Sequence, residues 1–409
     1  MAIIIYLIYL LSGIIKTVFV FYGIKFSIDI TLLSGVLLLI YLGYDLYVNG
    51  VKLRYQKDVL VSIILLTGFL MWIIISVFHS LSTGYAYRKT FLFLTNLIAF
   101  LFPLIIKQFD LSKFLRLFSV SVILAFVWFY YRYFNFIGKL DKSEIYYQIM
   151  GLSLTIAIYG GIILLTLLTS KTRIFKNLFY NFTVIIFLSG FLLLSGARGP
   201  IFFAVFSLTL FYLVKLPKVN FFKRIRINKI IKISFFISTL IISVFLVVYK
   251  YYDKISVLTE RSLYRISLIL NGIRSGSNMG DSVNVRVNQI EFAVNSISEN
   301  VQNFLIGYGF GSFGIMYSGV DGRLYPHNVL LEIWFELGFI GLIIFSAFLF
   351  SIFFDRIKKR IFISGFVMLY IFLNMLKSNS IVDIRVFFAF FAFFIINSNI
   401  RKEIVDNEN

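Results

Sequence analysis

Long apolar runs separated by short polar segments dominate the chain. A helix needs about 20 predominantly apolar residues to cross the hydrocarbon core of a bilayer. Runs of this kind occur at 3–22, 28–47, 59–78, 90–106, 117–137, 148–168, 178–194, 200–216, 230–250, 327–352, 361–376 and 384–398. The pattern predicts an all-α polytopic membrane protein with about 12 transmembrane helices. The first run lacks a basic region and a small-residue cleavage site, so we expect it to be a spanning helix rather than a signal peptide.

Composition supports the membrane assignment. Of 409 residues, 60% are hydrophobic and only 14% are charged, too few polar residues to cover a soluble globule. The absence of cysteine excludes disulfides and thiolate metal ligands. A net charge of +20 would suggest a nucleic-acid partner in a soluble protein. No such partner is expected here, because Lys and Arg cluster in short loops between the apolar runs, as orientation signals do.

The charged loops predict the orientation. Loops after the even-numbered runs, together with the C-terminal tail, carry 22 Lys and Arg. The opposite short loops hold seven, which are Lys25, Arg88, Lys89, Lys139, Lys142, Arg198 and Lys377. Basic loops stay in the cytoplasm, so both termini are expected there.

One connection is long and predicts a fourfold division. We expect spanning helices one to nine in 1–252, a large extracytoplasmic loop in 253–326, helices ten to twelve in 327–398 and a cytoplasmic tail in 399–409. Long ordered loops are usually functional. Apolar residues at helical spacing predict an amphipathic helix in this loop, with Asp281 or Ser282 as its cap; they are Val283, Val287, Ile290, Val294 and Ile297.

Three arginines on the predicted outer face are candidate anion ligands. Arg198 lies in a tight turn of small residues, where its planar fork could reach phosphate oxygens; the alternative is an arginine that snorkels to lipid headgroups. Arg286 lies beside the apolar stripe of the loop helix, and its alternative is a solvated helix-face charge. Arg265 shares a helix face with Arg261, where a solvated charge is the favoured interpretation.

The segment Gly307-Tyr308-Gly309-Phe310-Gly311 is glycine-rich but lacks the lysine and preceding strand of a nucleotide loop. We interpret Gly307 and Gly309 as positions where backbone approaches backbone or ligand closely.

Pro326-His327-Asn328 opens the tenth apolar run. Pro fits the first turn of a helix, which would place His327 and Asn328 at a helix N-terminus that favours anions. His327 is a candidate general base, with a capping or headgroup-contacting histidine as the alternative. The other histidine, His79, is expected near Arg88 at the interface.

Glu332 and Glu336 lie inside the same run. Acids within a membrane usually face the bundle interior or a wet cavity. We interpret Glu336 as a structural partner for an arginine. No motif predicts a metal site, and no cofactor is expected.

From residue 190 to 345 the chain resembles the bacterial O-antigen polymerase and O-antigen ligase superfamily. The resemblance rests on Ser195-Gly196-Ala197-Arg198-Gly199, Arg286, the glycine-rich segment, and the sequence from His327-Asn328 through Glu336-Leu337-Gly338 to Gly341. It implies a membrane glycosyltransferase of the GT-C type that uses a glycan on undecaprenyl diphosphate and needs no metal. Arg198 and Arg286 would bind the diphosphate, and His327 would activate the acceptor hydroxyl or contact the diphosphate, at the periplasmic face of a bacterial inner (plasma) membrane.

Three functions remain open. A polymerase would transfer the growing glycan to a lipid-linked repeat unit, and a chain-length regulator should then act with it. A ligase would transfer the finished glycan to lipid A core. A twelve-helix flippase or transporter is the alternative from another class, and it predicts internal repeats and ionisable residues at the midplane. The aromatic content of 19% favours the polymerase, since it suits a protein that handles carbohydrate.

Overall fold

The computed structural model describes residues 2–24, 29–50, 57–106, 109–136, 144–170, 177–195, 197–215, 281–353 and 363–406. These residues form helices and loops, and no strand occurs among them. The helices are α1 (Ala2–Phe21), α2 (Ile30–Asn49), α3 (Lys57–Val77), α4 (Tyr85–Ile105), α5 (Leu111–Phe136), α6 (Glu144–Thr169), α7 (Leu178–Leu194), α8 (Arg198–Lys215), α11 (Asp281–Ser298), α12 (Val301–Ile306), α13 (Phe313–Ser318), α14 (Val329–Phe353), α15 (Gly365–Ser378) and α16 (Arg385–Asp406).

Seven helices in the described part of the chain are long and apolar enough to cross a membrane: α1 to α6 and α14. This supports a multi-pass membrane protein. Helices α7, α8, α15 and α16 match predicted runs but have shorter apolar stretches. The predicted ninth run, 230–250, lies outside the described residues, so about twelve spans and the GT-C architecture stay predictions. The expected tail begins within α16, which continues to Asp406.

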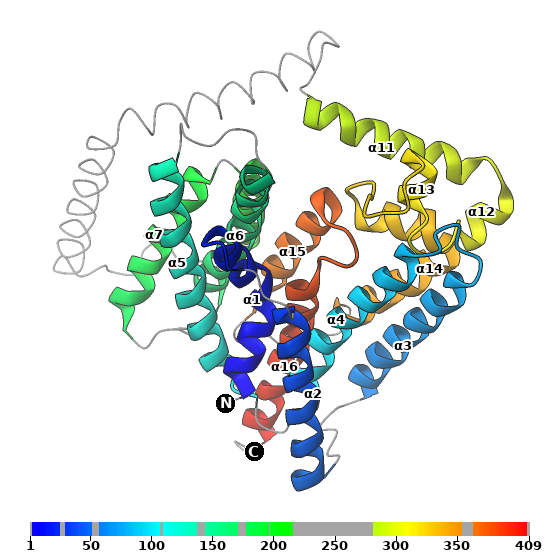
Figure 1. Ribbon diagram of the computed structural model, residues 1–409. Coiled ribbons are helices and arrows are strands. Elements are labelled where there is room, and N and C mark those ends of the chain that lie inside the picture. Colours follow the sequence, from blue (N-terminus) through cyan, green and yellow to red (C-terminus); the bar gives the residue numbers. More distant parts are fainter. Residues whose placement is uncertain are drawn as a thin grey trace.

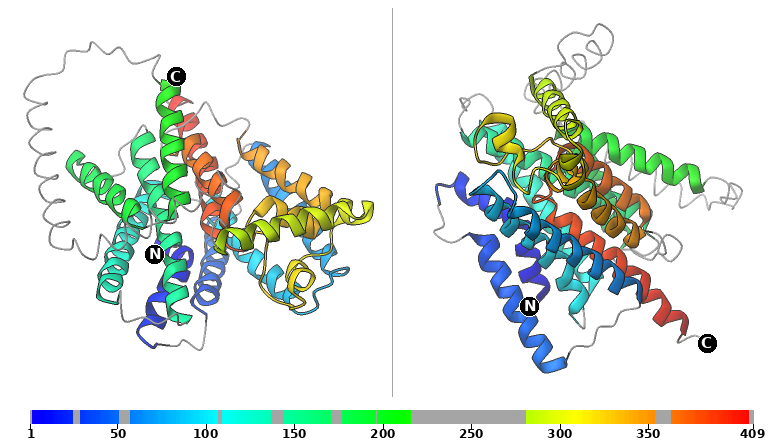
Figure 2. Two further views of the ribbon diagram at one scale, coloured as in Figure 1. Left: turned by 90° about the horizontal axis from the view of Figure 1, so that it is seen from above. Right: turned by 90° about the vertical axis from the view of Figure 1, so that its right-hand side faces the viewer.

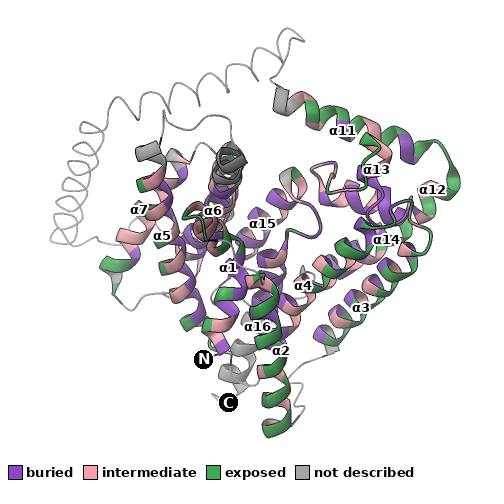
Figure 3. Ribbon diagram, in the orientation of Figure 1, coloured by how far each residue is buried: buried purple, intermediate pink, exposed green. Residues whose placement is uncertain are grey.

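Pairs of long helices organise the core. Helix α3 packs along α14, α4 along α16, and α1 along α2, while α6 lies among α5, α7 and α8 (Figures 1 and 2). Helix α2 is largely exposed, as expected for a helix that faces lipid, whereas the C-terminal helix α16 is buried between residues 386 and 395 (Figure 3). The charged and glycine-rich segments therefore surround the ends of a dense, aromatic helix bundle.

Helix α14 is broken where the sequence predicts one continuous span. Gly338 has φ 66° and ψ −175°, so the helix divides into a segment from Val329 to Leu337 and a second segment after it. Helices normally leave their last carbonyls without intrahelical partners. Here the carbonyls of Phe335 and Glu336 accept from the amides of Tyr308 and Gly309 at 3.0 and 2.9 Å. The Leu337 carbonyl accepts from the indole of Trp72 at 2.9 Å.

Helix α11 forms as predicted, but most of the described residues of its apolar stripe are exposed rather than packed against the protein. Val287, Ile290 and Val294 are 40%, 38% and 47% exposed, and only Ile297 is buried. The face of α11 that contacts the protein instead contains Gln289, Ala293, Ser296 and Ile297, since small residues allow close approach to α14 and its aromatic side chains. Asp281 is the first residue of the helix rather than its cap.

Candidate functional site

A buried ion cluster joins α4 to α14. The ammonium of Lys89 lies 2.6 Å from Glu332 Oε1 and 2.6 Å from Glu336 Oε2, and all three side chains are at most 1% exposed. Glu332 also accepts from the Ser380 hydroxyl and the Ile381 amide, at 2.7 and 2.9 Å. The cluster therefore holds together α4, the first segment of α14 and the loop that precedes α16.

The cluster corrects two predictions. Glu336 pairs with a lysine and not with an arginine. Lys89 was expected in an outer loop, but α4 begins at Tyr85 and places it in the second turn of the helix. The predicted run began at residue 90 because Tyr87, Arg88 and Lys89 lower the local hydropathy, although Lys89 is fully buried.

The glycine-rich loop packs against the backbone of other segments. This agrees with the interpretation of Gly307 and Gly309 as positions of close backbone approach, rather than as part of a phosphate-binding loop. Gly309 has φ 91°, and a Cβ there would lie 2.2 Å from Ser80 Cα. A Cβ on Gly307 would lie 2.5 Å from the Gly338 amide nitrogen. The Gly311 amide donates to Glu336 Oε2 at 2.9 Å. The loop thus connects the buried ion cluster to the break in α14.

His327 lies directly before α14 and has an unusual backbone. Its φ is 54°, the only positive value outside glycine among the described residues. Such a conformation costs about 1–3 kcal/mol and often marks a functional site. The ring of His327 contacts that of Tyr325, with centroids 4.6 Å apart. Pro326 precedes α14 by three residues and is not in its first turn, contrary to the prediction.

Asn328 caps α14. Its Oδ1 accepts from the amides of Leu330 and Leu331 at 3.0 and 3.1 Å. The side chain thereby satisfies two of the first-turn donors, so a structural role accounts for Asn328. The cap fixes the direction of α14 immediately after His327.

Tyr325 lies against His327, and its phenol is influenced by several charged groups. Burial raises the pKa of Tyr325 to about 12, Asp383 adds to the effect, Arg323 opposes it, and Arg286 on α11 opposes it less strongly. Arg286 is half-buried. The Tyr325 phenol therefore stays neutral at physiological pH.

Arg198 is the first residue of α8, at the position expected from the sequence. The neighbouring Gly199 lies against Lys377 of α15, whose Nζ would be 2.5 Å from a Cβ on the glycine. The lysine also lies over the ring of Phe203, 5.8 Å from its centroid. A second cation thus accompanies the start of α8.

Arg88 lines a cavity of about 470 Å³, together with Tyr85, Asp321 and Arg323. Arg88 therefore does not share a cavity with His327 in the described part of the chain. Arg265 lies outside the described residues, as do Arg261 and residues 253–280 of the predicted loop.

Asp321 links the loop after α3 to the loop before α14. Its carboxylate accepts from the Ser82 hydroxyl at 2.5 Å and from the Gly84 amide at 2.8 Å. The Ser82 bond, followed by the amide bonds, holds the pKa of Asp321 below its ordinary value. A depressed folded-state pKa stabilises the fold above the unfolded pKa, and this contribution is lost as pH falls through the folded value.

Asp321→Ala is accordingly expected to lower the melting temperature of the solubilised protein by a few degrees at pH 7. The reason is that the Ser82 hydroxyl and the amides of Gly84 and Tyr85 lose their acceptor. The difference from wild type should shrink below about pH 4 as the wild-type carboxyl takes up a proton. Melting curves at pH 7, 5 and 3 measure this, with the exposed Glu291→Ala as control. An equal difference at all three values would contradict the assignment to charge.

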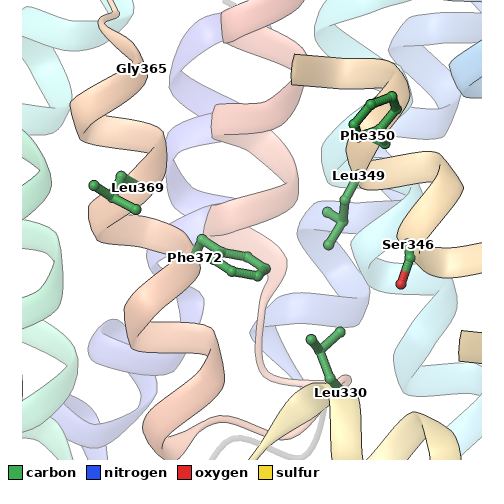
Figure 4. A pocket seen from close by; sticks show the side chains of 7 residues that line it. All are labelled: Leu330, Ser346, Leu349, Phe350, Gly365, Leu369 and Phe372. Carbon is green, nitrogen blue, oxygen red and sulfur yellow. The ribbon is translucent and has the colours of Figure 1, made fainter. Parts of the chain in front are cut away.

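An apolar cavity of about 370 Å³ lies between α14 and α15 (Figure 4). Its lining residues include no ionisable group; they are Leu330, Ser346, Leu349, Phe350, Gly365, Leu369 and Phe372. Leu330, in the first turn of α14, is part of this lining and follows the candidate base His327 by three residues. Such a lining suits a hydrocarbon chain better than a sugar or phosphate.

Metal chemistry has no evident location in the described residues, where no group of three or more His, Cys, Asp or Glu is placed to hold an ion. The main residues that sequence reasoning missed are Lys89, Tyr325, Asp383 and Arg385. Glu332 and Glu336, four residues apart inside one span, could have indicated a buried cation such as Lys89. Asp383 and Arg385 were overlooked because they lie at the edge of the predicted run 384–398.

Residues 182–346 match the family model described as O-Antigen ligase. The matched part contains Arg198, Arg286, the glycine-rich loop, His327 and most of α14. No curated protein sequence matches the chain.

Proposed function

We propose that the protein polymerises a surface polysaccharide at the periplasmic face of the bacterial inner membrane; the match of residues 182–346 to the family model described as O-Antigen ligase supports this proposal. The donor is a growing glycan on undecaprenyl diphosphate, and the acceptor is the non-reducing end of a lipid-linked repeat unit. No metal or cofactor takes part, and a chain-length regulator acts with the enzyme.

In the proposed reaction, His327 takes the proton from the acceptor hydroxyl as that oxygen forms a bond to the anomeric carbon of the donor. The bond from this carbon to the diphosphate oxygen breaks, and undecaprenyl diphosphate leaves with the bonding electrons. Arg198 and Arg286 stabilise the negative charge that develops on the leaving group. Two guanidiniums can supply the charge that a divalent cation supplies in other glycosyltransferases.

The observation that supports this proposal is the strained backbone of His327 directly before α14, with its ring against Tyr325, inside the part of the chain that matches the family model. The backbone strain at His327 persists because the Asn328 cap and the packing of Tyr325 determine the turn. The apolar cavity between α14 and α15 supplies space for a polyprenyl chain beside this turn. The candidate base therefore lies at the start of α14, the helix that forms one wall of this cavity.

The break in α14 gives the transporter alternative one supporting feature, since broken helices form ion sites in transporters. In this chain, however, the freed carbonyls of residues 335–337 accept from Tyr308, Gly309 and Trp72. They are therefore occupied by the protein itself and do not coordinate an ion, which favours the enzyme.

Deletion in the native host distinguishes these functions. A polymerase predicts loss of the polysaccharide ladder with a single repeat unit left on the core. A ligase predicts loss of all glycan from the core and long polymer on undecaprenyl diphosphate. An unchanged ladder would reject both enzymes in favour of the transporter.

We expect Arg198→Ala, Arg286→Ala and His327→Ala each to abolish polymer formation, because each removes charge stabilisation or the base, while membrane insertion stays normal. Glycan gels and immunoblots of membrane fractions measure the two properties. His79→Ala and Arg116→Ala are matched controls and should retain the ladder. Wild-type ladders from all three site variants would reject the site assignment.

A further inference from the structure

A second, polar cavity lies beside Tyr325, among α1, α6 and the first turn of α16. Its volume is about 410 Å³, large enough for one or two sugar rings. Its lining is mixed: apolar residues such as Leu10, Ile14 and Leu152 form part of it, and its polar side chains, which can both donate and accept hydrogen bonds, include Tyr159, Arg323, Tyr325, Asn379, Asp383 and Arg385. A mixture of tyrosine rings, amide, carboxylate and guanidinium is suited to a carbohydrate, whose hydroxyls need both kinds of partner.

The charges in this cavity are unequal. Arg323 and Asp383 form an ion pair at 2.5 Å and neutralise one another. Arg385 donates to the Ser12 hydroxyl at 2.9 Å and lies over the Tyr9 ring, 4.9 Å from its centroid. It forms no ion pair with any described carboxylate, and its buried Nε has no hydrogen-bond acceptor. The cavity therefore has a positive charge that the described residues leave uncompensated.

The backbone adds to this charge. Arg385, Val386 and Phe387 begin α16 and line the cavity. The first amides of a helix have no intrahelical acceptor and carry the positive end of the helix dipole. An uncompensated arginine and these amides at one wall of the cavity favour a bound anion.

The cavity also adjoins the proposed reaction centre. Tyr325 forms part of its lining, and its ring contacts that of His327. Asn379, which also lines the cavity, follows Lys377 by two residues, and Lys377 lies against Gly199, next to Arg198 in the sequence. Through Tyr325 the cavity therefore adjoins the surroundings of His327.

We propose that this cavity binds a sugar of the lipid-linked glycan through an oxyanion on or beside that sugar, with Arg385 as its counter-charge and Arg323 and Asp383 as ligands for its hydroxyls. The oxyanion is a carboxylate of an acidic sugar or a phosphate of the lipid diphosphate. The proposal rests on the proposed function and deepens it, because it names the part of the substrate that lies next to His327.

Binding to the full chain in lipid nanodiscs tests the proposal without turnover. Isothermal titration calorimetry would use methyl glucuronide as the acidic-sugar probe and farnesyl diphosphate as the lipid-diphosphate probe. Arg385→Gln keeps a hydrogen-bond donor for Ser12 but removes the charge, and Arg385→Lys keeps the charge. Arg116→Gln is the matched control, since Arg116 also bonds a serine hydroxyl, that of Ser112, but lies in α5 outside the cavity lining.

We expect Arg385→Gln to weaken binding of one probe about tenfold or more, because a charge-assisted hydrogen bond is lost, while Arg385→Lys partly restores it and Arg116→Gln has no effect. The affected probe identifies the source of the oxyanion. Equal affinities of wild type and Arg385→Gln, or failure of wild type to bind either probe, would overturn the proposal. An unchanged ladder on deletion rejects the proposed function but leaves an Arg385-dependent binding result intact, so the two failures are distinguishable.

Discussion

Lys89→Met is expected to leave very little correctly folded protein in the membrane. The substitution removes the cation that lies between Glu332 and Glu336 and leaves two carboxylates in a dry interior. Breaking a buried ion pair from one side costs about 3–5 kcal/mol, because the remaining charge is buried without compensation. The loss should also disorder the glycine-rich loop, since the Gly311 amide bonds the same Glu336 carboxylate.

The amount of monodisperse protein after mild solubilisation, and its melting temperature, measure this effect. Arg88→Met is the matched control, because it removes a neighbouring cation that lines an open cavity and should change stability little. The triple variant Lys89→Met, Glu332→Gln, Glu336→Gln removes all three charges and should recover part of the lost stability. A Lys89→Met protein as stable as wild type would show that the cluster does not maintain the fold.

Gly338→Ala is expected to damage the fold almost as severely. Gly338 has φ 66°, and a Cβ there would lie 2.2 Å from the Leu305 carbonyl oxygen of α12. Backbone at φ 66° and ψ −175° is adopted almost only by glycine, so an alanine there costs about 1–3 kcal/mol, and a forced shift of packed backbone adds about 1–3 kcal/mol. Helix α12 must then move away, so the amides of Tyr308 and Gly309 lose the carbonyls at the end of the first α14 segment.

Thermal unfolding and polymer formation, measured on the same membranes, test this prediction. Gly68→Ala is the control, because Gly68 lies in α3, which packs along α14, and a Cβ there meets no atom within 4 Å. Helix propensity predicts a neutral or slightly stabilising effect for the control. If both variants melted together with wild type and retained polymer, the break at Gly338 would have no role in holding the loop.

Figure 1 helps to explain why the two substitutions affect the same region. Helices α11, α12 and α13 lie beside the start of α14, and the ion cluster and the helix break both fasten this group to α3 and α4. The candidate base precedes α14 by two residues. Positioning of His327 therefore depends on residues that touch no substrate, and their variants should lose activity through loss of this arrangement.

Local sequence properties determined the helical class and the outline of the site. Apolar runs must become helices in lipid because every backbone group needs a partner, so eleven predicted runs coincide with helices of the described residues. Local signals placed Arg198 and His327 near the starts of helices, but Arg198 is the first residue of α8 rather than part of the preceding turn, and His327 precedes α14 by two residues. Tertiary structure alone decided which residues meet. The partner of Glu336 lies 247 positions away in α4, and Arg385, at the start of the last helix, shares a cavity with Tyr325. Hydropathy cannot predict such pairings, because a buried lysine and a loop lysine have the same sequence signal until packing removes one of them from water.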